Sequence, residues 1–190
     1  MKIEVVLIDS IDGDSLTSLK NYDENKNLFK INKFEAEKNQ MFFLANLDSS
    51  NDVSKLIVGT KGCETAYDFV NLGSLIGKKI GQDCDIQLIS KSDNLDIFSI
   101  EFGIVISSYN FDNFKSEKNP KQNFKILDSS HNEEIQNKID SIFWVRDMVN
   151  YPAITKSPEF FEEKVKELIK NLNIKLDSYD EEWLRENNMG

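Results

Sequence analysis

Short, nearly continuous apolar runs occur three times in the first 60 residues, and they predict strands that are buried on both faces. They are KIEVVLID at residues 2–9, MFFLANL at 41–47 and KLIVGT at 55–60. Runs of this length, rich in Val, Ile and Phe, are typical of buried strands. The polar stretch after the first run, up to about Asn27, predicts a loop.

After Gly62 the apolar residues recur every three or four positions, which predicts a helix. They are Ala66, Phe69, Val70, Gly73, Ile76, Gly77 and Ile80. The next run, CDIQLIS at residues 84–90, predicts a further strand. Because the helix connects two strands, we expect those strands to run parallel.

The run LDIFSIEFGIVISSYNF at residues 95–111 fits two patterns. Positions 98, 100, 102, 104 and 106 alternate as in a strand, whereas positions 95, 98, 102, 105 and 109 fit one face of a helix. Periodicity alone does not decide between a strand and a helix.

The last third of the chain predicts one more strand of the sheet and then a helix, a strand and a helix. NFKILD at 123–128 is the strand, and an amphipathic helix follows it up to Asn150. Ser157 and Pro158 signal a helix start, followed by IKLDSY at 174–179 as a strand and DEEWLRENN at 180–188 as a short helix. The helix after Pro158 has an apolar stripe formed by Phe161, Val165, Leu168, Ile169 and Leu172. The whole pattern predicts an α/β fold, a mixed sheet flanked by helices, with a trailing helix-strand-helix piece.

Composition and charge exclude several classes of partner. The chain has 33 acidic and 23 basic residues and a net charge of −10, which disfavours nucleic acid and anionic membrane surfaces. No apolar run approaches about 20 residues, and the start lacks the features of a signal peptide. We therefore expect a cytoplasmic protein.

Few residues suit catalysis or metal binding. Cys63 and Cys84 lack the spacing of a zinc or redox site and are expected to be reduced and mostly buried. His131 is the single histidine, which leaves almost no basis for a histidine-rich zinc site or a catalytic triad. It precedes a predicted helix, where a capping or surface role is favoured.

The remaining candidates have structural interpretations that outweigh functional ones. GTKG at residues 59–62 lacks the longer phosphate-loop patterns, so a tight turn is favoured over a phosphate site. Arg146 lies on or beside the predicted buried stripe, which favours an ion pair, with Asp147 or a C-terminal carboxylate, over substrate binding. Solvated charge on helices is favoured for three acidic pairs, Glu133 and Glu134, Glu162 and Glu163, and Glu181 and Glu182.

The segment RDMVNYPAITKSPEFFEEKVKEL at 146–168 resembles the segment that links the two domains of leucyl aminopeptidases. The matching positions are Arg146, Asp147, Val149, Asn150, Pro152, Ala153, Pro158 and Glu159. Ile154 departs from the family pattern, which has Asn there and so gains a local side-chain hydrogen bond.

Two further stretches resemble the same family. GIVISSYNFDNFKS at 103–116 carries Ser108, Tyr109, Phe111, Asp112 and Lys115 in register, and NNMG at the end is similar to a family GMG with Asn188 in place of the first glycine. The resemblance covers roughly residues 55–190. It favours a helix for the ambiguous run at 95–111.

The resemblance implies a macro-domain-like, non-catalytic N-terminal domain at residues 1–150. Residues 151–190 would be the interdomain linker helix and the start of a catalytic domain. In that family the catalytic domain holds two divalent metals, zinc or manganese, that activate a water molecule against the N-terminal peptide bond of a peptide. The motifs that carry those metal ligands do not occur in this sequence, so no catalytic, cofactor-binding or metal-binding residue is assigned here.

The resemblance also implies a role in assembly and in control of substrate access, because the family forms homo-hexamers around an inner cavity. The chain itself would be inactive, and peptide substrates would be bound by the missing domain. Two alternatives stay open. One is a macro-like module that binds a nucleotide or ADP-ribose, and the other is a degenerate structural paralogue.

Overall fold

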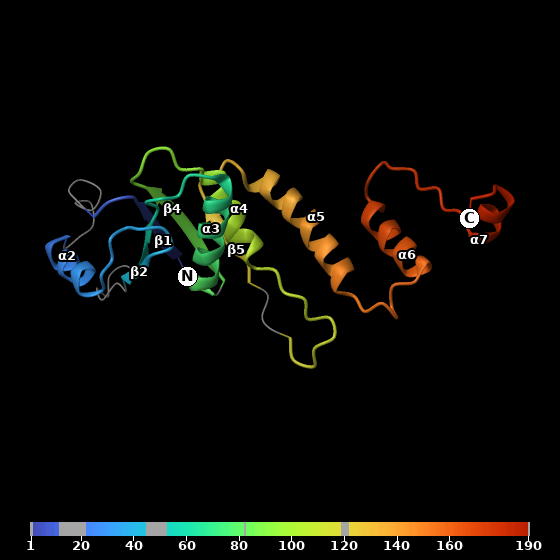
Figure 1. Cartoon of the computed structure of the whole chain (residues 1–190), viewed down its shortest axis with the longest axis horizontal. Helices are drawn as coiled ribbons and strands as arrows, with labels where there is room; N and C mark the ends of the chain where they lie inside the picture. Colours follow the sequence, from blue (N-terminus) through green and yellow to red (C-terminus); the bar gives the residue numbers. More distant parts are fainter. Residues whose placement is uncertain (1, 12–21, 45–52, 82, 119–121, 190) are drawn as a thin grey trace. The chain divides into compact units, whose positions relative to one another are not determined.

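The computed structural model describes residues 2–11, 22–44, 53–81, 83–118 and 122–189 (Figure 1). The strands are β1 (Lys2–Ile8), β2 (Met41–Leu44), β3 (Val53–Gly59), β4 (Cys84–Ser90) and β5 (Phe124–Leu127). The helices are α2 (Tyr22–Ile31), α3 (Ala66–Ile80), α4 (Ile97–Ile106), α5 (Asn132–Asn150), α6 (Pro158–Ile169) and α7 (Glu181–Glu186). No described helix combines the length and the hydrophobicity that a membrane crossing requires.

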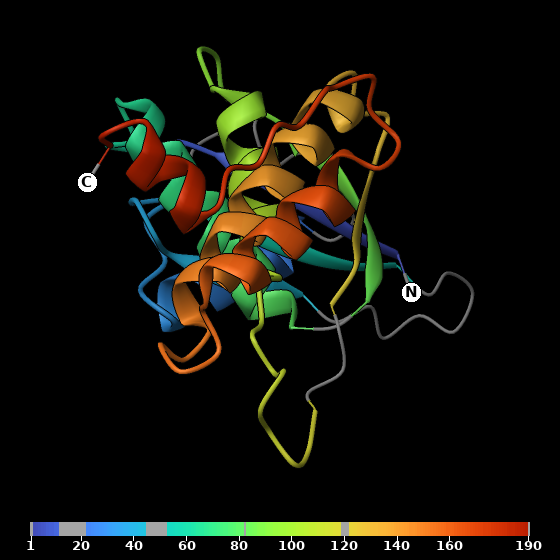
Figure 2. The same cartoon turned by 90° about the vertical axis from the view of Figure 1, so that its right-hand side faces the viewer.

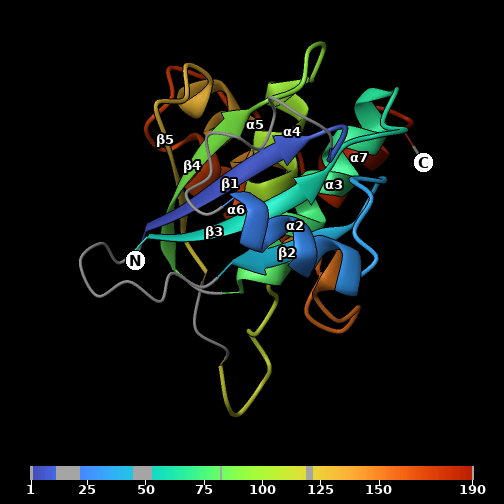
Figure 3. The ribbon, with the colours of Figure 1, turned by 90° about the vertical axis from the view of Figure 1, so that its left-hand side faces the viewer.

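The five strands form one mixed sheet in the order β2-β3-β1-β4-β5 (Figure 3). β1 is central and parallel to β3 and β4, with Val5 opposite Leu56 on one side and Leu88 on the other. β5 is parallel to β4, whereas β2 is antiparallel to β3. The predicted parallel orientation of β3 and β4 is therefore confirmed, although β1 lies between them.

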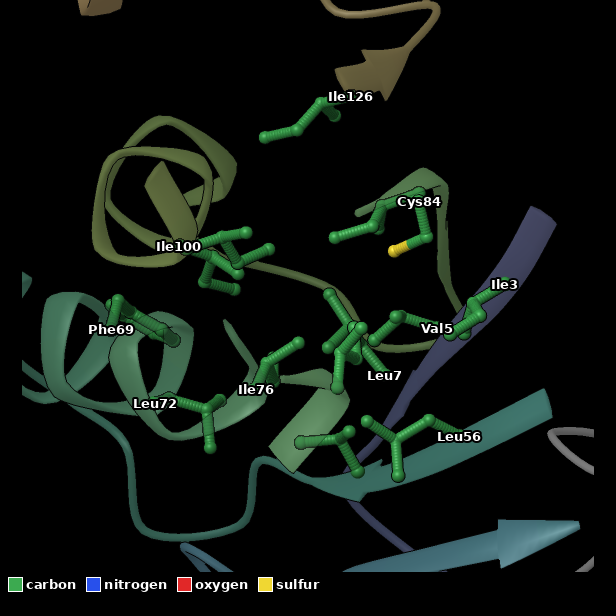
Figure 4. Close-up of a cluster of buried hydrophobic side chains, with 14 residues drawn as sticks. Ile3, Val5, Leu7, Leu56, Phe69, Leu72, Ile76, Cys84, Ile100 and Ile126 are labelled. Atoms are coloured by element: carbon green, nitrogen blue, oxygen red, sulfur yellow. The ribbon is translucent and has the colours of Figure 1, made fainter. Parts of the chain in front are cut away.

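Each face of the sheet carries its own apolar cluster, because successive residues of a strand point to opposite faces. Val5 and Leu7 of β1 face α3 and α4, while Val6 and Ile8 face α2 and the segment after it. Figure 4 shows the larger cluster. Its buried residues are Ile3, Val5, Leu7, Leu56, Val58, Phe69, Leu72, Ile76, Ile80, Cys84, Ile86, Ile100, Ile104 and Ile126.

Glycine lets α3 and α4 approach closely above this cluster. A Cβ atom at Gly73 would lie 2.1 Å from the carbonyl oxygen of Ile100, and one at Gly103 would lie 2.2 Å from that of Val70. The hydroxyl of Ser74 donates to the carbonyl of Gly103 at 3.1 Å. The two backbones are thus in contact, with no room for a side chain between them.

The helix expected from the resemblance at 95–111 is confirmed by α4, whereas two other expectations are wrong. The loop expected up to Asn27 is helical from Tyr22 onward, and residues 12–21 lie outside the described part of the chain. Phe29 of α2 is buried, with ring centroids 5.2 Å from Phe34 and 5.3 Å from Phe42. This tertiary packing stabilises a helix that its own polar sequence only weakly favours.

The strand expected at residues 174–179 is absent, so the trailing piece is two helices without a strand (Figure 2). Every residue of this stretch is exposed, and none pairs with another described strand. Since a strand requires a hydrogen-bonded neighbour, its sequence pattern alone does not form one. Leu172 likewise lies beyond the end of α6 at Ile169. Of the run MFFLANL, residues 45–47 are outside the described residues.

The chain divides into two compact units, Met1–Trp144 and Val145–Gly190, so the division falls within α5. Unit 1 contains the sheet with α2, α3, α4 and the first part of α5. Unit 2 contains the end of α5 with α6 and α7. The domain boundary at residue 150 stays a prediction from the resemblance.

Replacing Gly103 with alanine is expected to lower the free energy of unfolding by about 1–3 kcal/mol. The added methyl group meets backbone atoms of α3, which cannot move without separating the helices, and this outweighs the roughly 1 kcal/mol gain in helix propensity. Urea unfolding followed by circular dichroism measures the change. Lys79→Ala, at an exposed position of α3, is the control and should change stability by less than about 0.5 kcal/mol. A Gly103→Ala variant as stable as the parent would contradict the proposed contact.

Candidate functional site

The carboxyl ends of β1, β3 and β4 meet at one edge of the sheet, which is where α/β sheets commonly bind ligands. The backbone N–H of Thr60 donates to the carbonyl of Ile8 at 2.8 Å, and that of Lys91 donates to Leu7 at 2.9 Å. The hydroxyl oxygens of Thr60 and Ser92 lie 3.4 Å apart, and Thr60 is buried. This edge, which contains GTKG, is the first candidate for a ligand site.

GTKG forms the tight turn that its sequence predicts. Gly62 has a φ of 84°, a conformation that glycine adopts without strain, and the N–H of Cys63 donates to the carbonyl of Thr60 at 3.0 Å. At Gly59 a Cβ atom would lie 2.3 Å from the carbonyl oxygen of Glu37. The glycines therefore serve a turn and a close backbone contact.

At the N-terminus of α3, where a phosphate would be expected to bind, the carboxylate of Asp68 already accepts the backbone N–H groups just before the helix. Asp68 Oδ2 accepts the backbone N–H groups of Thr65 and Glu64 at 3.0 and 3.2 Å and the Thr65 hydroxyl at 2.9 Å. The hydroxyl of Thr65 accepts the N–H of Asp68 in return, which completes a capping box. Lys38 forms an ion pair with the other oxygen of Asp68.

These contacts make Asp68 an internal anion at the helix end. The bond to Lys38, followed by those to Thr65 and Glu64, holds the pKa of the Asp68 carboxyl far below its usual range. The hydrogen bond to Asp68 likewise raises the pKa of Lys38. A phosphate could bind here only by displacing a carboxylate from its lysine and its backbone donors, so the arrangement disfavours nucleotide binding at this edge.

Both cysteines are free thiols: Cys84 is buried and Cys63 is half-buried. Burial raises the pKa of each thiol. A raised pKa lowers the fraction of thiolate at neutral pH, and thiolate is the nucleophilic form. Neither cysteine is placed as a reactive group.

His131 lies directly before α5, where its carbonyl accepts the N–H of Ile135 at 2.9 Å. Its own N–H donates to the hydroxyl of Ser129 at 3.1 Å, and its ring packs edge-on against Phe98 with centroids 5.3 Å apart. The residue thus takes part in the start of the helix, as its sequence position predicts.

Arg146 is exposed, so its expected place beside a buried stripe is wrong. The buried residues of α5 are Ile135 and Ile139, near its start, whereas Val149 near its end is exposed. An ion pair of Arg146 with Asp147 stays a prediction.

The acidic pairs lie on helix surfaces, as expected. Glu134 pairs with Lys138 at 2.7 Å, Glu162 with Lys166 at 2.6 Å and Glu181 with Arg185 at 2.5 Å. The two residues of each ion pair are one helical turn apart, and an ion pair at this spacing stabilises a helix by a few tenths of a kcal/mol. No group of three or more His, Cys, Asp or Glu side chains with metal-binding geometry occurs among the described residues. These residues do not fit the pair of metal ions that the family resemblance implies for a full-length enzyme.

Glu101 is the one buried carboxylate of the described core, and the spacing of the apolar residues does not reveal it. It is 3% exposed, and its Oε2 accepts the hydroxyl of Ser129 at 2.7 Å. Burial raises the pKa of Glu101, while the Ser129 bond and the nearby His131 partly oppose the rise. The signal was present as a single charge inside the apolar run Ile97–Ile106.

Ser129, His131 and Glu101 do not form a nucleophilic triad. The Ser129 hydroxyl donates a hydrogen bond to the carboxylate of Glu101 and accepts one from the backbone N–H of His131. A nucleophilic serine needs its proton held by a base such as an imidazole ring, which this geometry does not provide. The cluster instead joins α4 to the beginning of α5.

Unit 2 contains no buried side chain among its described residues, 145–189. Ser157 caps α6 by accepting the N–H of Phe160 at 3.2 Å, as predicted, and Ile154 in the preceding turn is 96% exposed. Its large exposed hydrophobic residues are Val145, Val149, Ile154, Phe161, Leu168, Leu172, Ile174, Leu176, Tyr179, Leu184 and Met189. Small units with so little buried surface are not stable alone.

The structure is similar over nearly its entire length to solved structures of aminopeptidases and of the bottromycin maturation enzyme BotP. A mutant of tomato leucine aminopeptidase matches with a TM-score of 0.74 and 16% identity over 100% of this chain and 43% of that one. The bottromycin maturation enzyme BotP in complex with Mn matches with a TM-score of 0.73 and 18% identity over 97% of this chain and 39% of that one. The cytosol aminopeptidase from Coxiella burnetii matches with a TM-score of 0.65 and 17% identity over 98% of this chain and 39% of that one.

These likenesses establish the fold. The mixed five-stranded sheet flanked by helices matches the N-terminal domain of leucine aminopeptidases. The chain spans about two fifths of the length of these structures. No family model and no curated protein matches the sequence.

Replacing Asp68 with asparagine is expected to make the chain less stable at neutral pH and to flatten the acid limb of its stability profile. Ionised Asp68 has a lowered pKa in the folded state, so it stabilises the fold above the pKa of the unfolded carboxyl. That contribution is lost as the pH falls through the folded pKa. Urea unfolding between about pH 7 and about pH 2 measures the free energy of unfolding of the parent chain and of Asp68→Asn. Glu64→Gln at the exposed neighbouring position is the control, and a constant difference between parent and Asp68→Asn at all pH values would contradict the assignment.

Proposed function

We propose that this chain is the non-catalytic N-terminal part of a leucyl-aminopeptidase-type protein, with a role in assembly and in control of substrate access. The single observation that carries the proposal is the structural match over the whole chain to about two fifths of longer aminopeptidase structures. The peptide hydrolysis would belong to a separate metal-dependent domain, as would the binding of zinc or manganese. The chain alone is inactive in this proposal, and the complete protein is a cytoplasmic homo-oligomer, a hexamer by resemblance.

The exposed side chains of unit 2 support this assignment. The match to tomato leucine aminopeptidase includes unit 2, since it covers 100% of the chain. An apolar surface of this kind requires another folded body to cover it. In the proposed protein that body is the catalytic domain, and α6 is the helix that joins it to the α/β domain.

The nucleotide-binding alternative is disfavoured by the charge at the sheet edge. Asp68 already accepts the N–H groups of Glu64 and Thr65, just before α3, and the chain as a whole carries a net charge of −10. Both features oppose an anionic ligand.

The purified 190-residue chain is expected to show no hydrolysis of leucine amide when Mn²⁺ or Zn²⁺ is added. The described residues lack a cluster that could hold a metal ion and activate water. Release of ammonia is measured against a metallo-aminopeptidase as positive control. Turnover that persists through repeated purification and disappears with a chelator would contradict the assignment of the chain as non-catalytic.

ADP-ribose is expected to give no measurable heat of binding in titration calorimetry with this chain. The carboxylate of Asp68 occupies the anion-binding end of α3 and would repel the diphosphate. A Kd in the micromolar range would favour the macro-like binding module instead. Asp68→Asn in a parallel titration shows whether this carboxylate is the group that opposes the ligand.

A further inference from the structure

Glu101 combines burial with ionisable chemistry and has no role in the proposed function. It is 3% exposed on α4, between two apolar turns, and its carboxylate is directed to the connection between β5 and α5. Burying a carboxylate is unfavourable unless polar partners compensate for the lost water. The polar partners of Glu101 therefore indicate which role a buried carboxylate has at this position.

Those partners form a continuous series of contacts from α4 to the first turns of α5. Ser129 donates to Glu101 at 2.7 Å and accepts the N–H of His131 at 3.1 Å. The carbonyl of His131 then accepts the N–H of Ile135, in the first turn of α5. Beside this series, Lys138 lies 4.6 Å from the centre of the Phe98 ring, which also contacts His131.

We propose that Glu101 is a pH-dependent latch that holds the first turns of α5 against α4, more firmly when its carboxyl is protonated. The latch consists of Glu101, Ser129 and His131. It acts on the part of α5 that belongs to unit 1, so it sets how firmly that part of the helix is attached to the sheet.

The charged groups near the latch are those of the described elements packed against α4. The elements packed against α4 are α3, β5 and α5. The charged residues of these elements that lie near Glu101 are exposed or paired. His131, directly before α5, differs because it acts on Glu101 and lowers the pKa of the Glu101 carboxyl. These other residues are Asp68, Lys78 and Lys79 of α3, Lys125 of β5, Asp128 after it, and Glu133, Glu134 and Lys138 of α5.

The direction of the pH effect follows from the burial of Glu101. We call the state with the first turns of α5 packed against α4 closed, and the state with these turns detached open. Burial raises the pKa of the Glu101 carboxyl in the closed state above its value in water. The closed state then binds a proton more tightly than the open state, so closing is strengthened below the ordinary glutamate pKa. This extra stability is lost as the pH rises through the raised pKa. The Ser129 hydrogen bond and the nearby His131 oppose this rise without cancelling it, because burial is the larger cause.

Amide hydrogen exchange measured by NMR tests the latch in the intact chain. After correction for intrinsic rates, the amides of residues 135–139 should be protected roughly threefold or more strongly at about pH 5 than at about pH 7.5. Glu101→Gln keeps the shape and an acceptor for Ser129 but does not titrate. The amides of α3 serve as the internal reference. In Glu101→Gln the protection of residues 135–139 should change with pH no more than the protection of the α3 amides does.

Two further measurements keep the test decisive. Ser129→Ala should reduce the protection of residues 135–139 at both pH values, because the donor to Glu101 is lost. In the parent chain, the carboxyl carbon of Glu101 should titrate above the ordinary glutamate range, which needs no variant to fold. The proposal is overturned if parent and Glu101→Gln show the same pH dependence, or if Glu101 titrates at or below the ordinary range.

Discussion

The close contact between α3 and α4 is the constraint on which the α/β unit depends. Both helices must lie on the same face of the sheet to cover the larger apolar cluster. Gly73 and Gly103 allow this, because a methyl group at either position would overlap backbone of the other helix. The apolar side chains of both helices can then point down to the strands instead of toward each other. The position of α4 in turn fixes where Glu101, and with it the start of α5, is held.

The carboxyl edge of the sheet has the form of a ligand site without its chemistry, because its polar groups already bond to one another. The N–H groups of Glu64 and Thr65, just before α3, are satisfied by the carboxylate of Asp68, and the charge of that carboxylate is balanced by Lys38. Asp68 is three residues beyond Thr65, as a capping box requires. The edge at which α/β sheets commonly bind ligands is used here to stabilise a helix. Function must therefore be inferred from the side chains, since the fold alone permits both.

The sequence predicts those elements whose signal is local or strongly periodic. The continuous runs of β1, β3 and β4 and the one-sided apolar pattern of α3 correspond to the observed elements, and so does the Ser157 cap of α6. The failures depend on distant partners: α2 is stabilised by ring packing with Phe34 and Phe42, and residues 174–179 lack a neighbouring strand. Asp68 and Glu101 escaped notice for the same reason. Lys38 and Ser129, which give these carboxylates their roles, are about 30 residues away in sequence.

The two units differ in the interactions that offset the conformational entropy lost when the chain folds. Unit 1 buries side chains on both faces of its sheet, whereas unit 2 forms capped helices with surface ion pairs and no described buried side chain. Caps and exposed ion pairs contribute about 1 kcal/mol or less each, far below the entropy of ordering several turns of helix. Caps and ion pairs alone therefore do not account for the stability of α6 and α7. Because the match to a longer leucine aminopeptidase structure covers 100% of this chain, the likeness in fold extends from the sheet to the helices of the unit that has no described buried side chain.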